Sequence, residues 1–418
     1  MANLRINIKR LESNLSELGK IGRNDSNGID RAFGTDSDIN ARKWLEKYWR
    51  KLGGTFRTDY IANLWLDMKG EDNIPKIVIG SHHDAVPNGG MFDGALGVLI
   101  ATELYETIKE NHIKLRHPFS IISFTGEEPN EFNVSTLGSK VMSGRLVKSD
   151  LSEINSFCRN LSLASAVEKA GGDIKYSDSI LVMPGEISAF IEIHNEQGKR
   201  LENEDKSVAV VECITGIYRE IITVTGEANH AGTTVMGDRF DALTAASEYI
   251  LGVERILKDF DDDELVATIG YIDVNPNSAN IIPGQVKMIM DLRFSDNAKK
   301  QKVISAFDSL QKDISDRRKV KLERFVNLDQ PYRNMHHDVI EAIEKSMQQL
   351  GQSPKRLTSM AGHDAANMAI VTRSGMIFVK SKDGKSHCPE EFSAIEDIEI
   401  AANVALLTLL ELDKGLDF

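Results

Sequence analysis

Residues 81–94, SHHDAVPNGGMFDG, place two histidines, two aspartates and three glycines directly after the short apolar run KIVIG. Imidazole and carboxylate groups suit Zn²⁺, Mn²⁺, Co²⁺ or Ni²⁺, whereas a structural zinc site would draw mainly on thiolates. The stretch therefore predicts a metal site after a buried strand. The alternative is a polar turn between a strand and a helix, in which the histidines have no chemical role.

The spacing within this stretch favours the metal site. Residues two apart in an extended segment point the same way, so Asp84 is placed to accept a hydrogen bond from the nitrogen of His82 that faces away from the metal. Such a bond fixes the orientation of the ring and raises its basicity. His83 would point the opposite way and is the weaker ligand candidate.

Further polar clusters follow other apolar segments of the chain. In parallel α/β sheets, ligands gather at the carboxyl ends of the strands, so these clusters would meet at one edge. Each cluster alone is a weak indication, because a histidine at a strand end is more often structural, but four clusters on one sheet favour a metal site. Of two adjacent glutamates, one can bind metal while the other takes a proton from water. The residues are Glu127 and Glu128 after FSIISF, His194 and Glu196 after AFIEI, His387 beyond MIFVKS, and Asp93 at the start of a helix.

The elements that would carry these residues alternate between strand and helix in the first half of the chain. We expect helices over 40–52 and from residue 93 onward, and buried strands over 76–80, 119–124 and 189–198. The helix after residue 93 is apolar on several faces, as a helix covered on both sides would be. This alternation predicts an α/β fold with a doubly wound, largely parallel sheet.

The pattern changes at about residue 213. The order of the expected elements becomes β-α-β-β-α-β, which is the ferredoxin-like split arrangement. After it, the chain returns to the buried-strand pattern of the first half. We therefore predict a metal-binding catalytic domain over residues 1–212 and 328–418, with a small α+β domain inserted over 213–327. The inserted elements are strands over 219–227, 264–274, 284–294 and 319–326, and helices over 238–257 and 296–314.

Composition limits the possible partners. The 418 residues are 41% hydrophobic and carry a net charge of −13, which is typical of a globular protein and argues against nucleic-acid or anionic-membrane partners. Three widely spaced cysteines favour a reducing cytoplasm over a disulfide framework. The N-terminal segment resembles an amphipathic helix more than a signal peptide, and no window is apolar enough to span a bilayer. We expect a soluble, cytoplasmic protein.

An anionic substrate would need local arginines, because the overall negative charge of the chain repels it. Arg293 ends the expected strand MIMDLR, and Arg219 begins another. The guanidinium group suits a carboxylate because it donates two parallel hydrogen bonds. The alternative is that both arginines serve solubility at strand edges.

Eight motifs in order resemble the hydantoinase/carbamoylase branch of the metal-dependent M20-type amidohydrolases. This branch includes N-carbamoyl-L-amino-acid hydrolases, allantoate amidohydrolases and β-ureidopropionases. The resemblance extends from about residue 30 to the C-terminus, and E-x-H-x-E-Q-G together with N-H-A-G-T-T separates the branch from the related peptidases and deacylases. The segments are GSHHDAVPNGGMFDGALGV, FTGEEPNEF, EIHNEQG, GEANHAGTT, NSANIIPG, DLR, AGHDAANMA and DGKSHCPEEF.

The resemblance implies two divalent metal ions (Zn, Mn, Co or Ni) in each subunit. Glu127 would be the general base that acts on the attacking water, and Asp93 would bridge the ions. The remaining ligands would be His82 and His194 for one ion, and Glu128 and His387 for the other.

The resemblance also implies roles for the inserted domain, which would be the dimerisation and lid domain of a homodimer. His230 of one subunit would reach into the active site of the other and stabilise the developing oxyanion. Arg219, Asn280 and Arg293 match positions that hold the substrate carboxylate and its neighbouring polar groups. The role of His363 stays open between structure and substrate contact.

The chain departs from the usual motifs without losing a ligand. Ala85 stands where Thr or Ser is common, and Pro129 and Glu131 replace a usual Gly and Arg. Ile217 precedes Tyr218-Arg219 where G-Q-R is common. We expect the loop over 129–135 and Ile217 to line the pocket for the substrate side chain.

The expected activity is hydrolysis of the linear C–N bond of an N-carbamoyl (ureido) group on a small carboxylic acid. The first choice is conversion of an N-carbamoyl-L-amino acid to the L-amino acid, CO₂ and NH₃. The nearest alternative is allantoate amidohydrolase, and an M20 dipeptidase or N-acyl deacylase is more distant. A non-catalytic scaffold that kept the fold is the alternative from another class.

Overall fold

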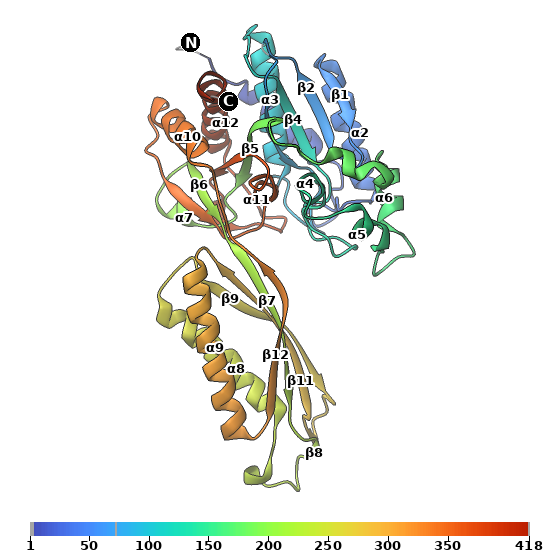
Figure 1. Cartoon of the computed structure of the whole chain (residues 1–418), viewed down its shortest axis with the longest axis vertical. Coiled ribbons are helices and arrows are strands. Elements are labelled where there is room, and N and C mark those ends of the chain that lie inside the picture. Colours follow the sequence, from blue (N-terminus) through green and yellow to red (C-terminus); the bar gives the residue numbers. More distant parts are fainter. Residues whose placement is uncertain (1–3, 72, 417–418) are drawn as a thin grey trace. The chain divides into compact units, whose positions relative to one another are not determined.

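The apolar runs of the sequence form the centre of a nine-stranded mixed sheet in the computed structural model, which describes residues 4–71 and 73–416 (Figure 1). The strand order is β1-β2-β4-β3-β5-β15-β6-β13, and β14 also pairs with β6. The strands are β1 (Thr55–Thr58), β2 (Leu64–Met68), β3 (Lys76–His82), β4 (Phe119–Phe124), β5 (Ile187–Asn195), β6 (Val208–Ile214), β13 (Arg333–Asn334), β14 (Arg356–Ser359) and β15 (Arg373–Val379).

The four central strands run parallel to one another. β3 pairs in parallel with β4 and with β5, and β15 pairs in parallel with β5. These strands are buried along nearly their whole length, as strands covered on both faces must be. β2 and β6 flank them in antiparallel pairs. The prediction of a doubly wound, largely parallel sheet is confirmed, and the carboxyl ends of its strands lie at one edge.

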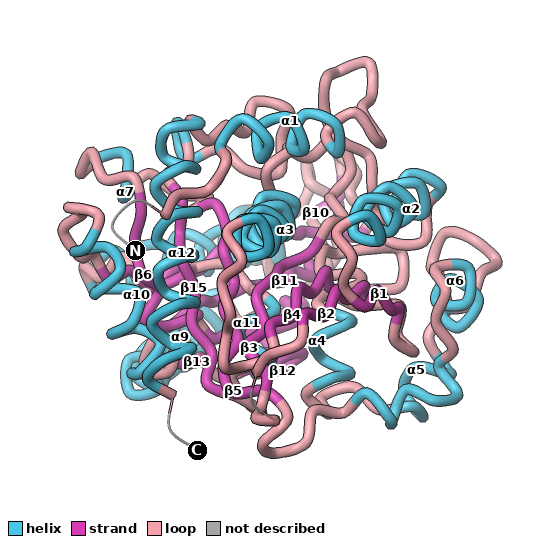
Figure 2. The backbone as a smooth tube through the Cα atoms, turned by 90° about the horizontal axis from the view of Figure 1, so that it is seen from above, coloured by secondary structure: helices cyan, strands magenta, loops and turns pink. Residues whose placement is uncertain are grey.

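Helices cover both faces of this sheet. α3 (Ala95–Glu110) packs on β3, β4 and β5 and is buried over almost its whole length, as its apolar sequence predicts. Figure 2 shows α2 (Asp36–Lys51) and α3 on one side of the strands, with α4 (Leu137–Met142) and α5 (Lys148–Glu153) on the other. The remaining helices are α1 (Ile8–Leu18), α6 (Leu163–Lys169), η1 (Ile174–Ile180), α7 (Arg200–Asn203), α10 (His337–Gln349), α11 (Asp364–Met368), η3 (Lys382–Gly384) and α12 (Ile395–Gly415).

The inserted segment forms a separate four-stranded antiparallel sheet of order β12-β7-β11-β9. This is the strand order of a ferredoxin-like unit, with its first and third strands in the centre. The central strand β7 alternates between buried and partly exposed residues, and Figure 1 shows α8 and α9 side by side on one face of the sheet. The elements are β7 (Gly216–Thr225), β8 (Asn229–His230), η2 (Met236–Asp238), α8 (Ala242–Phe260), β9 (Val266–Asn275), β10 (Ile281–Ile282), β11 (Gln285–Phe294), α9 (Asn297–Arg318) and β12 (Lys321–Gln330).

The chain divides into two units, one over residues 1–212, 334–357 and 363–418, and the other over 213–333 and 358–362. The second boundary falls a few residues after the expected position, because β12 continues to Gln330. A register shift between Val326 and Leu328 interrupts the alternation of that strand, which explains why its sequence pattern ended early. Across the described residues, no helix has both the length and the apolar character needed to cross a lipid bilayer.

Candidate metal centre

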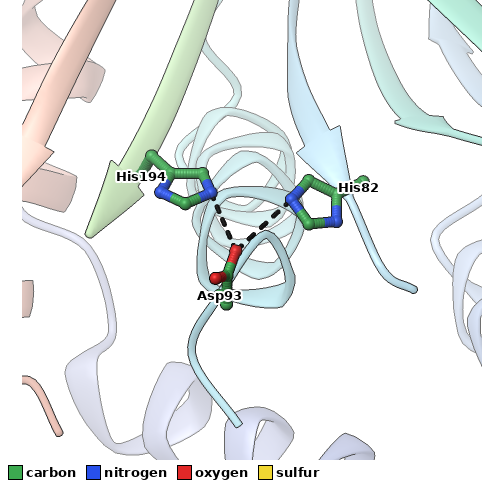
Figure 3. A group of neighbouring side chains, drawn as sticks. All are labelled: His82, Asp93 and His194. Atoms are coloured by element: carbon green, nitrogen blue, oxygen red, sulfur yellow. Dashed lines mark ion pairs between the residues drawn. The ribbon is translucent and has the colours of Figure 1, made fainter. Parts of the chain in front are cut away.

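Three predicted ligands form a buried group at the carboxyl edge of the parallel sheet. His82 ends β3 and His194 lies near the end of β5, and both strands lead to the same edge. Figure 3 shows both imidazole rings directed at Asp93, which precedes α3. Asp93 Oδ1 lies 3.5 Å from His82 Nε2 and 3.0 Å from His194 Nε2. Both histidine side chains are only 1% exposed, so this group is closed to bulk solvent.

A second group uses the other carboxylate oxygen of Asp93. His387 Nε2 lies 3.2 Å from Asp93 Oδ2 and 3.4 Å from Glu128 Oε1. In each of the two groups, one donor atom from every residue lies within 4.8 Å of the others. The five residues that the sequence predicted as ligands are therefore brought together, with Asp93 between the two groups.

The donor atoms fit divalent metal ions. Three imidazoles and two carboxylates are the ligand set of catalytic zinc and related transition-metal sites. Glu128 Oε1 is buried and has no hydrogen-bond partner, although a buried carboxylate oxygen is costly to leave unsatisfied. A cation at the second group would give this oxygen a partner. The residues present thus fit metal ions at both groups.

Protons and cations compete for these groups. Burial, together with the neighbouring charge of Asp93, raises the pKa of Glu128 to about 8. The contact with Asp93 raises the pKa of His387 to about 9. Burial opposes the charge on Asp93, but the imidazole of His194 holds its pKa well below the usual range. Because ligands must be deprotonated to bind, metal binding here would release protons.

Glu127 lies beside the buried group and is held by its backbone. The backbone N–H groups of Glu127 and Glu128 donate to the two carboxylate oxygens of Asp84, at 3.2 Å and 3.1 Å, and Thr136 N donates to the Glu127 carbonyl. Glu127 Oε2 lies 3.7 Å from His82 Nε2. Burial raises the pKa of the Glu127 carboxyl well above its usual range.

Asp84 lies against the His82 ring with its backbone carbonyl as well as its carboxylate. His82 Nδ1 lies 3.1 Å from the backbone carbonyl oxygen of Asp84 and 3.6 Å from its carboxylate. The ring is thus oriented mainly by the carbonyl oxygen, while the carboxylate holds the Glu127-Glu128 backbone. The spacing indicated that His82 and Asp84 lie together, but only the fold reveals which atoms meet.

Gly94 allows Asp93 and His82 to approach each other. Its φ of 63° lies in the left-handed region, and a Cβ at this position would overlap the His82 imidazole. His83 points away from the ligand groups, as predicted, with its ring between Asp38 Oδ1 at 2.9 Å and Ser123 Oγ at 2.7 Å. Arg42 completes this buried network by donating to Asp38.

Two other polar residues near the site have separate partners. The Glu196 carboxylate accepts hydrogen bonds from the backbone N–H groups of residues 200 and 201 at the start of α7. It therefore serves as a helix cap. His363 is buried, with its ring centroid 4.6 Å from that of His194, and burial lowers its pKa well below the usual value. A neutral ring at this position packs against a ligand without adding charge.

Residues at which the chain departs from the usual motifs also have defined partners. Ala85 is buried, and its N–H donates to the Arg31 carbonyl. Glu131 forms an ion pair with Arg159 and accepts from Ser156 Oγ, so its carboxylate is already engaged. The expectation that residues 129–135 and Ile217 line a substrate pocket stays a prediction.

Three residues around Asp93 were not singled out by the sequence. Gln197 Nε2 donates to Asp93 Oδ2 at 2.8 Å, and Ser386 Oγ lies 3.1 Å from the same oxygen. Glu391 accepts the backbone N–H groups of Phe92 and Asp93, both at 2.9 Å. Gln197 and Glu391 occur in the motifs EIHNEQG and DGKSHCPEEF, but spacing alone gives no reason to connect them to Asp93.

Within the inserted unit, two of the predicted substrate residues share one acid. Arg219 on β7 and Arg293 on β11 donate to different oxygens of Asp291, each at 2.5 Å. Asp291 is also the cross-strand partner of Arg219, which explains the close approach. Both guanidinium groups stay partly exposed, so N–H donors remain for an anionic ligand.

His230 and Asn280 lie on a short two-stranded ribbon of the same unit. Ile281 on β10 pairs with His230 on β8, and Ala231 N donates to the Asn280 carbonyl. His230 Nδ1 accepts backbone N–H groups from Gly232 at 3.0 Å and Thr233 at 3.2 Å. In the neutral ring the proton then sits on Nε2, which makes this exposed nitrogen a donor.

These features define a class of protein: an α/β protein with an inserted ferredoxin-like unit and a cluster of imidazoles and carboxylates suited to divalent metal ions. The chain belongs to the peptidase family M20/M25/M40, which matches residues 78–411.

Two relatives cover almost the whole chain. An N-carbamoyl-L-amino acid amidohydrolase of Geobacillus stearothermophilus is 34% identical over 412 residues, covering 97% of this chain and 99% of the relative. A ureidoglycolate hydrolase of Arabidopsis thaliana is 33% identical over 421 residues, covering 98% and 88%.

The fold is also similar to that of solved structures in the same branch. The crystal structure of an amidase of the hydantoinase/carbamoylase family from Burkholderia multivorans has a TM-score of 0.89 at 30% identity, covering 97% of this chain and 98% of that one. The predicted resemblance to the hydantoinase/carbamoylase branch of the M20 hydrolases is confirmed.

Proposed function

We propose that this chain is a metal-dependent amidohydrolase that cleaves the linear C–N bond of an N-carbamoyl group on a small carboxylic acid. The leading substrate class is an N-carbamoyl-L-amino acid, with the L-amino acid, CO₂ and NH₃ as products. The observation that carries this proposal is the pair of donor groups joined by Asp93, with the buried carboxylate of Glu127 beside them. Two divalent ions, chosen from Zn, Mn, Co and Ni, would be held by His82, Asp93, Glu128, His194 and His387.

The bound ions would polarise the carbamoyl carbonyl group and lower the pKa of water. Glu127 takes a proton from the attacking water onto its carboxylate and later delivers it to the departing nitrogen. Burial raises the pKa of this carboxyl group, which favours its holding the proton between the two steps. Asp84 keeps Glu127 in place by accepting the backbone N–H groups of the glutamate pair.

Residues of the inserted unit supply binding and charge stabilisation. Arg219 and Arg293, together with Asn280, hold the carboxylate of the substrate. His230 donates from Nε2 to the oxygen that becomes negative as the carbonyl carbon turns tetrahedral. The two backbone hydrogen bonds to Nδ1 support this role, because they leave Nε2 as the donor nitrogen.

We further propose a homodimer in which His230 acts on the active site of the partner subunit. A complementation experiment tests this arrangement. Glu127→Gln and His230→Ala variants, each inactive alone, are mixed under conditions that exchange subunits. A 1:1 mixture should recover about a quarter of wild-type activity, because half of the dimers are hybrids with one intact site. A mixture that exchanges subunits and stays inactive contradicts the shared site.

Substitution of the base tests the mechanism directly. Glu127→Gln should reduce kcat by about 10²–10⁴-fold with nearly unchanged metal content, because the base is not a ligand. Glu103→Gln is the matched control: it changes another buried carboxylate, one that binds Arg10, and should affect stability with little change in kcat. Loss of metal together with turnover in Glu127→Gln would mean that Glu127 is a ligand.

Ureido acids related to ureidoglycolate and allantoate form the second candidate class of substrate. The relative named ureidoglycolate hydrolase is 33% identical, and the relative named N-carbamoyl-L-amino acid amidohydrolase is 34% identical, so identity does not separate them. Ammonia release measured on N-carbamoyl-L-amino acids, ureidoglycolate, allantoate and β-ureidopropionate, with Mn²⁺, Co²⁺, Ni²⁺ or Zn²⁺, identifies the substrate. A dipeptide and an N-acyl amino acid test the more distant alternative of a peptidase or deacylase.

A non-catalytic scaffold is the contrasting hypothesis. Such a protein need not retain metal, so metal analysis of chain purified without chelator separates the two. The three free cysteines, Cys158, Cys213 and Cys388, support our placement of the enzyme in a reducing cytoplasm. The net charge of −13 supports a small-molecule substrate, with neither nucleic acid nor membrane as a partner.

A further inference from the structure

Glu391 connects the two loops that carry Asp93 and His387. It is 4% exposed, and its Oε1 accepts the backbone N–H groups of Phe92 and Asp93, both at 2.9 Å. Its Oε2 accepts from Ser386 Oγ, also at 2.9 Å. One carboxylate therefore holds the backbone at Asp93 and the residue next to His387, although these segments are almost 300 residues apart in the sequence.

Ser386 and Gln197 extend this network of hydrogen bonds to the carboxylate of Asp93. Ser386 Oγ lies 3.1 Å from Asp93 Oδ2, and Gln197 Nε2 donates to both Ser386 Oγ at 3.1 Å and Asp93 Oδ2 at 2.8 Å. A hydroxyl group has one proton, so Ser386 donates a hydrogen bond to either Glu391 or Asp93 at any one time. Asp93 Oδ2 is the oxygen that faces His387, which places this network directly behind the second ligand group.

The loop before Asp93 packs closely against Glu391. A Cβ at Gly90 would overlap the Glu391 carboxyl group, so the loop before Asp93 lies directly against it. The ring of Phe392 also packs edge-on against Phe92, with centroids 5.8 Å apart. The two segments thus meet at Glu391 through both polar and apolar contacts.

We propose that Glu391 is a positioning residue that sets the spacing between Asp93 Oδ2 and His387, and thereby the affinity of the second metal ion. The inference rests on the proposed function, because it assumes that both groups bind metal. Removal of the carboxylate leaves two buried backbone N–H groups without acceptors and frees Ser386 from its anchor. Residues that orient metal ligands typically change metal affinity by 10–100-fold when they are substituted.

Three variants of the full-length chain test the proposal. Glu391→Ala removes both acceptor oxygens, whereas Glu391→Gln keeps one oxygen for the two backbone N–H groups and an amide beside Ser386 Oγ. Glu390→Ala is the matched control, since Glu390 is the exposed neighbouring acid. Each protein is stripped with chelator and titrated with Mn²⁺ alone by calorimetry, while circular dichroism and thermal unfolding report folding.

In wild type and in Glu390→Ala we expect two Mn²⁺ ions per chain. In Glu391→Ala the weaker ion should bind at least about tenfold less tightly with the tighter ion retained, and Glu391→Gln should recover most of the affinity. A folded Glu391→Ala variant with two unchanged affinities overturns the proposal. If Glu391→Ala does not fold, Glu391→Gln decides: a smaller loss of affinity confined to the weaker ion supports the inference, and unchanged affinities or equal weakening of both ions overturn it.

The same titration separates this inference from the proposed function. A wild-type chain that binds no metal would refute the metal-dependent activity itself. A wild-type chain that binds two ions, with Glu391→Ala unchanged, would refute only the role of Glu391.

Discussion

The two ligand groups share Asp93 but are held by different parts of the fold. His82 and His194 belong to adjacent regions of a buried parallel sheet, and each side chain is 1% exposed. His387 lies on a loop at a φ of 55°, and its side chain is 48% exposed. The first group is therefore set by strand pairing, whereas the second depends on hydrogen bonds between loops.

Donor chemistry alone therefore does not determine how a candidate metal site is held. Both groups contain imidazole and carboxylate, yet the first is already fixed by the packing of the sheet and the second must be kept in place by Glu391 and Ser386. A preorganised site loses less conformational freedom on binding. We therefore expect the buried group to bind its ion more tightly and to release it more slowly.

Substitution of one histidine from each group should have the largest effect. Both His194→Ala and His387→Ala should lose at least about 10³-fold in kcat/KM, because in the proposed mechanism the ions would supply several kcal/mol of transition-state stabilisation. Metal content after dialysis should differ, with one ion retained by His387→Ala and less than one by His194→Ala. Elemental analysis measures this, and equal retention in both variants would contradict the comparison.

Gly94→Ala tests the buried group without removing a ligand. A Cβ there would overlap the His82 ring, and alanine is strained at a φ of 63°, so we expect about 3 kcal/mol of destabilisation and loss of the tightly bound ion. Denaturant unfolding and metal analysis provide the measurements. Gly415→Ala, at a position with open space and no positive φ, should have little effect on either.

Substitution of Asp38 tests how the neighbouring network of Asp38, His83 and Arg42 supports the buried ligand group. Burial opposes its charge, but Arg42 and His83 lower the pKa of Asp38 to about 2, compared with about 3.9 in an unfolded chain. A carboxyl group with a depressed folded pKa stabilises the fold above pH 3.9, and this contribution is lost as the pH falls through 2. The full contribution amounts to about 2.6 kcal/mol of unfolding free energy.

Wild type should therefore lose about 2 kcal/mol more than Asp38→Asn between pH 4 and pH 2, as measured by denaturant titration. Asp36→Asn, which changes an exposed acid of the same helix, should differ from wild type much less. Parallel pH profiles for wild type and Asp38→Asn would show that the buried network does not depend on this charge.

The rates at which the two ligand groups lose metal to a chelator should show the smallest of these effects. After mixing with excess chelator, metal loss should occur in two phases of equal size whose rates differ by about tenfold, which corresponds to about 1.4 kcal/mol. Residual activity should follow the fast phase, because both ions are required. A single phase would mean that the two groups release their ions together.

The sequence predicted the ligands more completely than the contacts that hold them. His82, His194 and the Glu127-Glu128 pair were singled out because each follows a recognisable apolar strand, and parallel strands bring their carboxyl ends to one edge. The family resemblance then chose Glu128 as the candidate ligand of the pair. Gln197 and Glu391 were not connected to the site, because their roles depend on the path of irregular loops. Residues in the left-handed region, including Gln197 and His387, direct these loops, and no periodic pattern predicts them.

The fold shows the same division between periodic and irregular features. The split β-α-β-β-α-β unit was predicted because its long strands and helices carry clear periodicity. The edge strand β1 and its neighbour β2 were missed, since four or five residues give little pattern, and the buried strand β6 was missed as well. The helix α12 was also missed, because it is buried on most of its faces and lacks a marked polar side.

The position of β15 has a consequence for biosynthesis. This strand lies between β5 and β6 in space, but the ribosome makes it only after the whole inserted unit. Until then, a nascent chain exposes two unpaired strand edges that favour misassembly, which makes prompt chaperone protection valuable. The delay also means that His387 emerges last among the candidate ligands, so a truncated translation product would lack part of the second donor group.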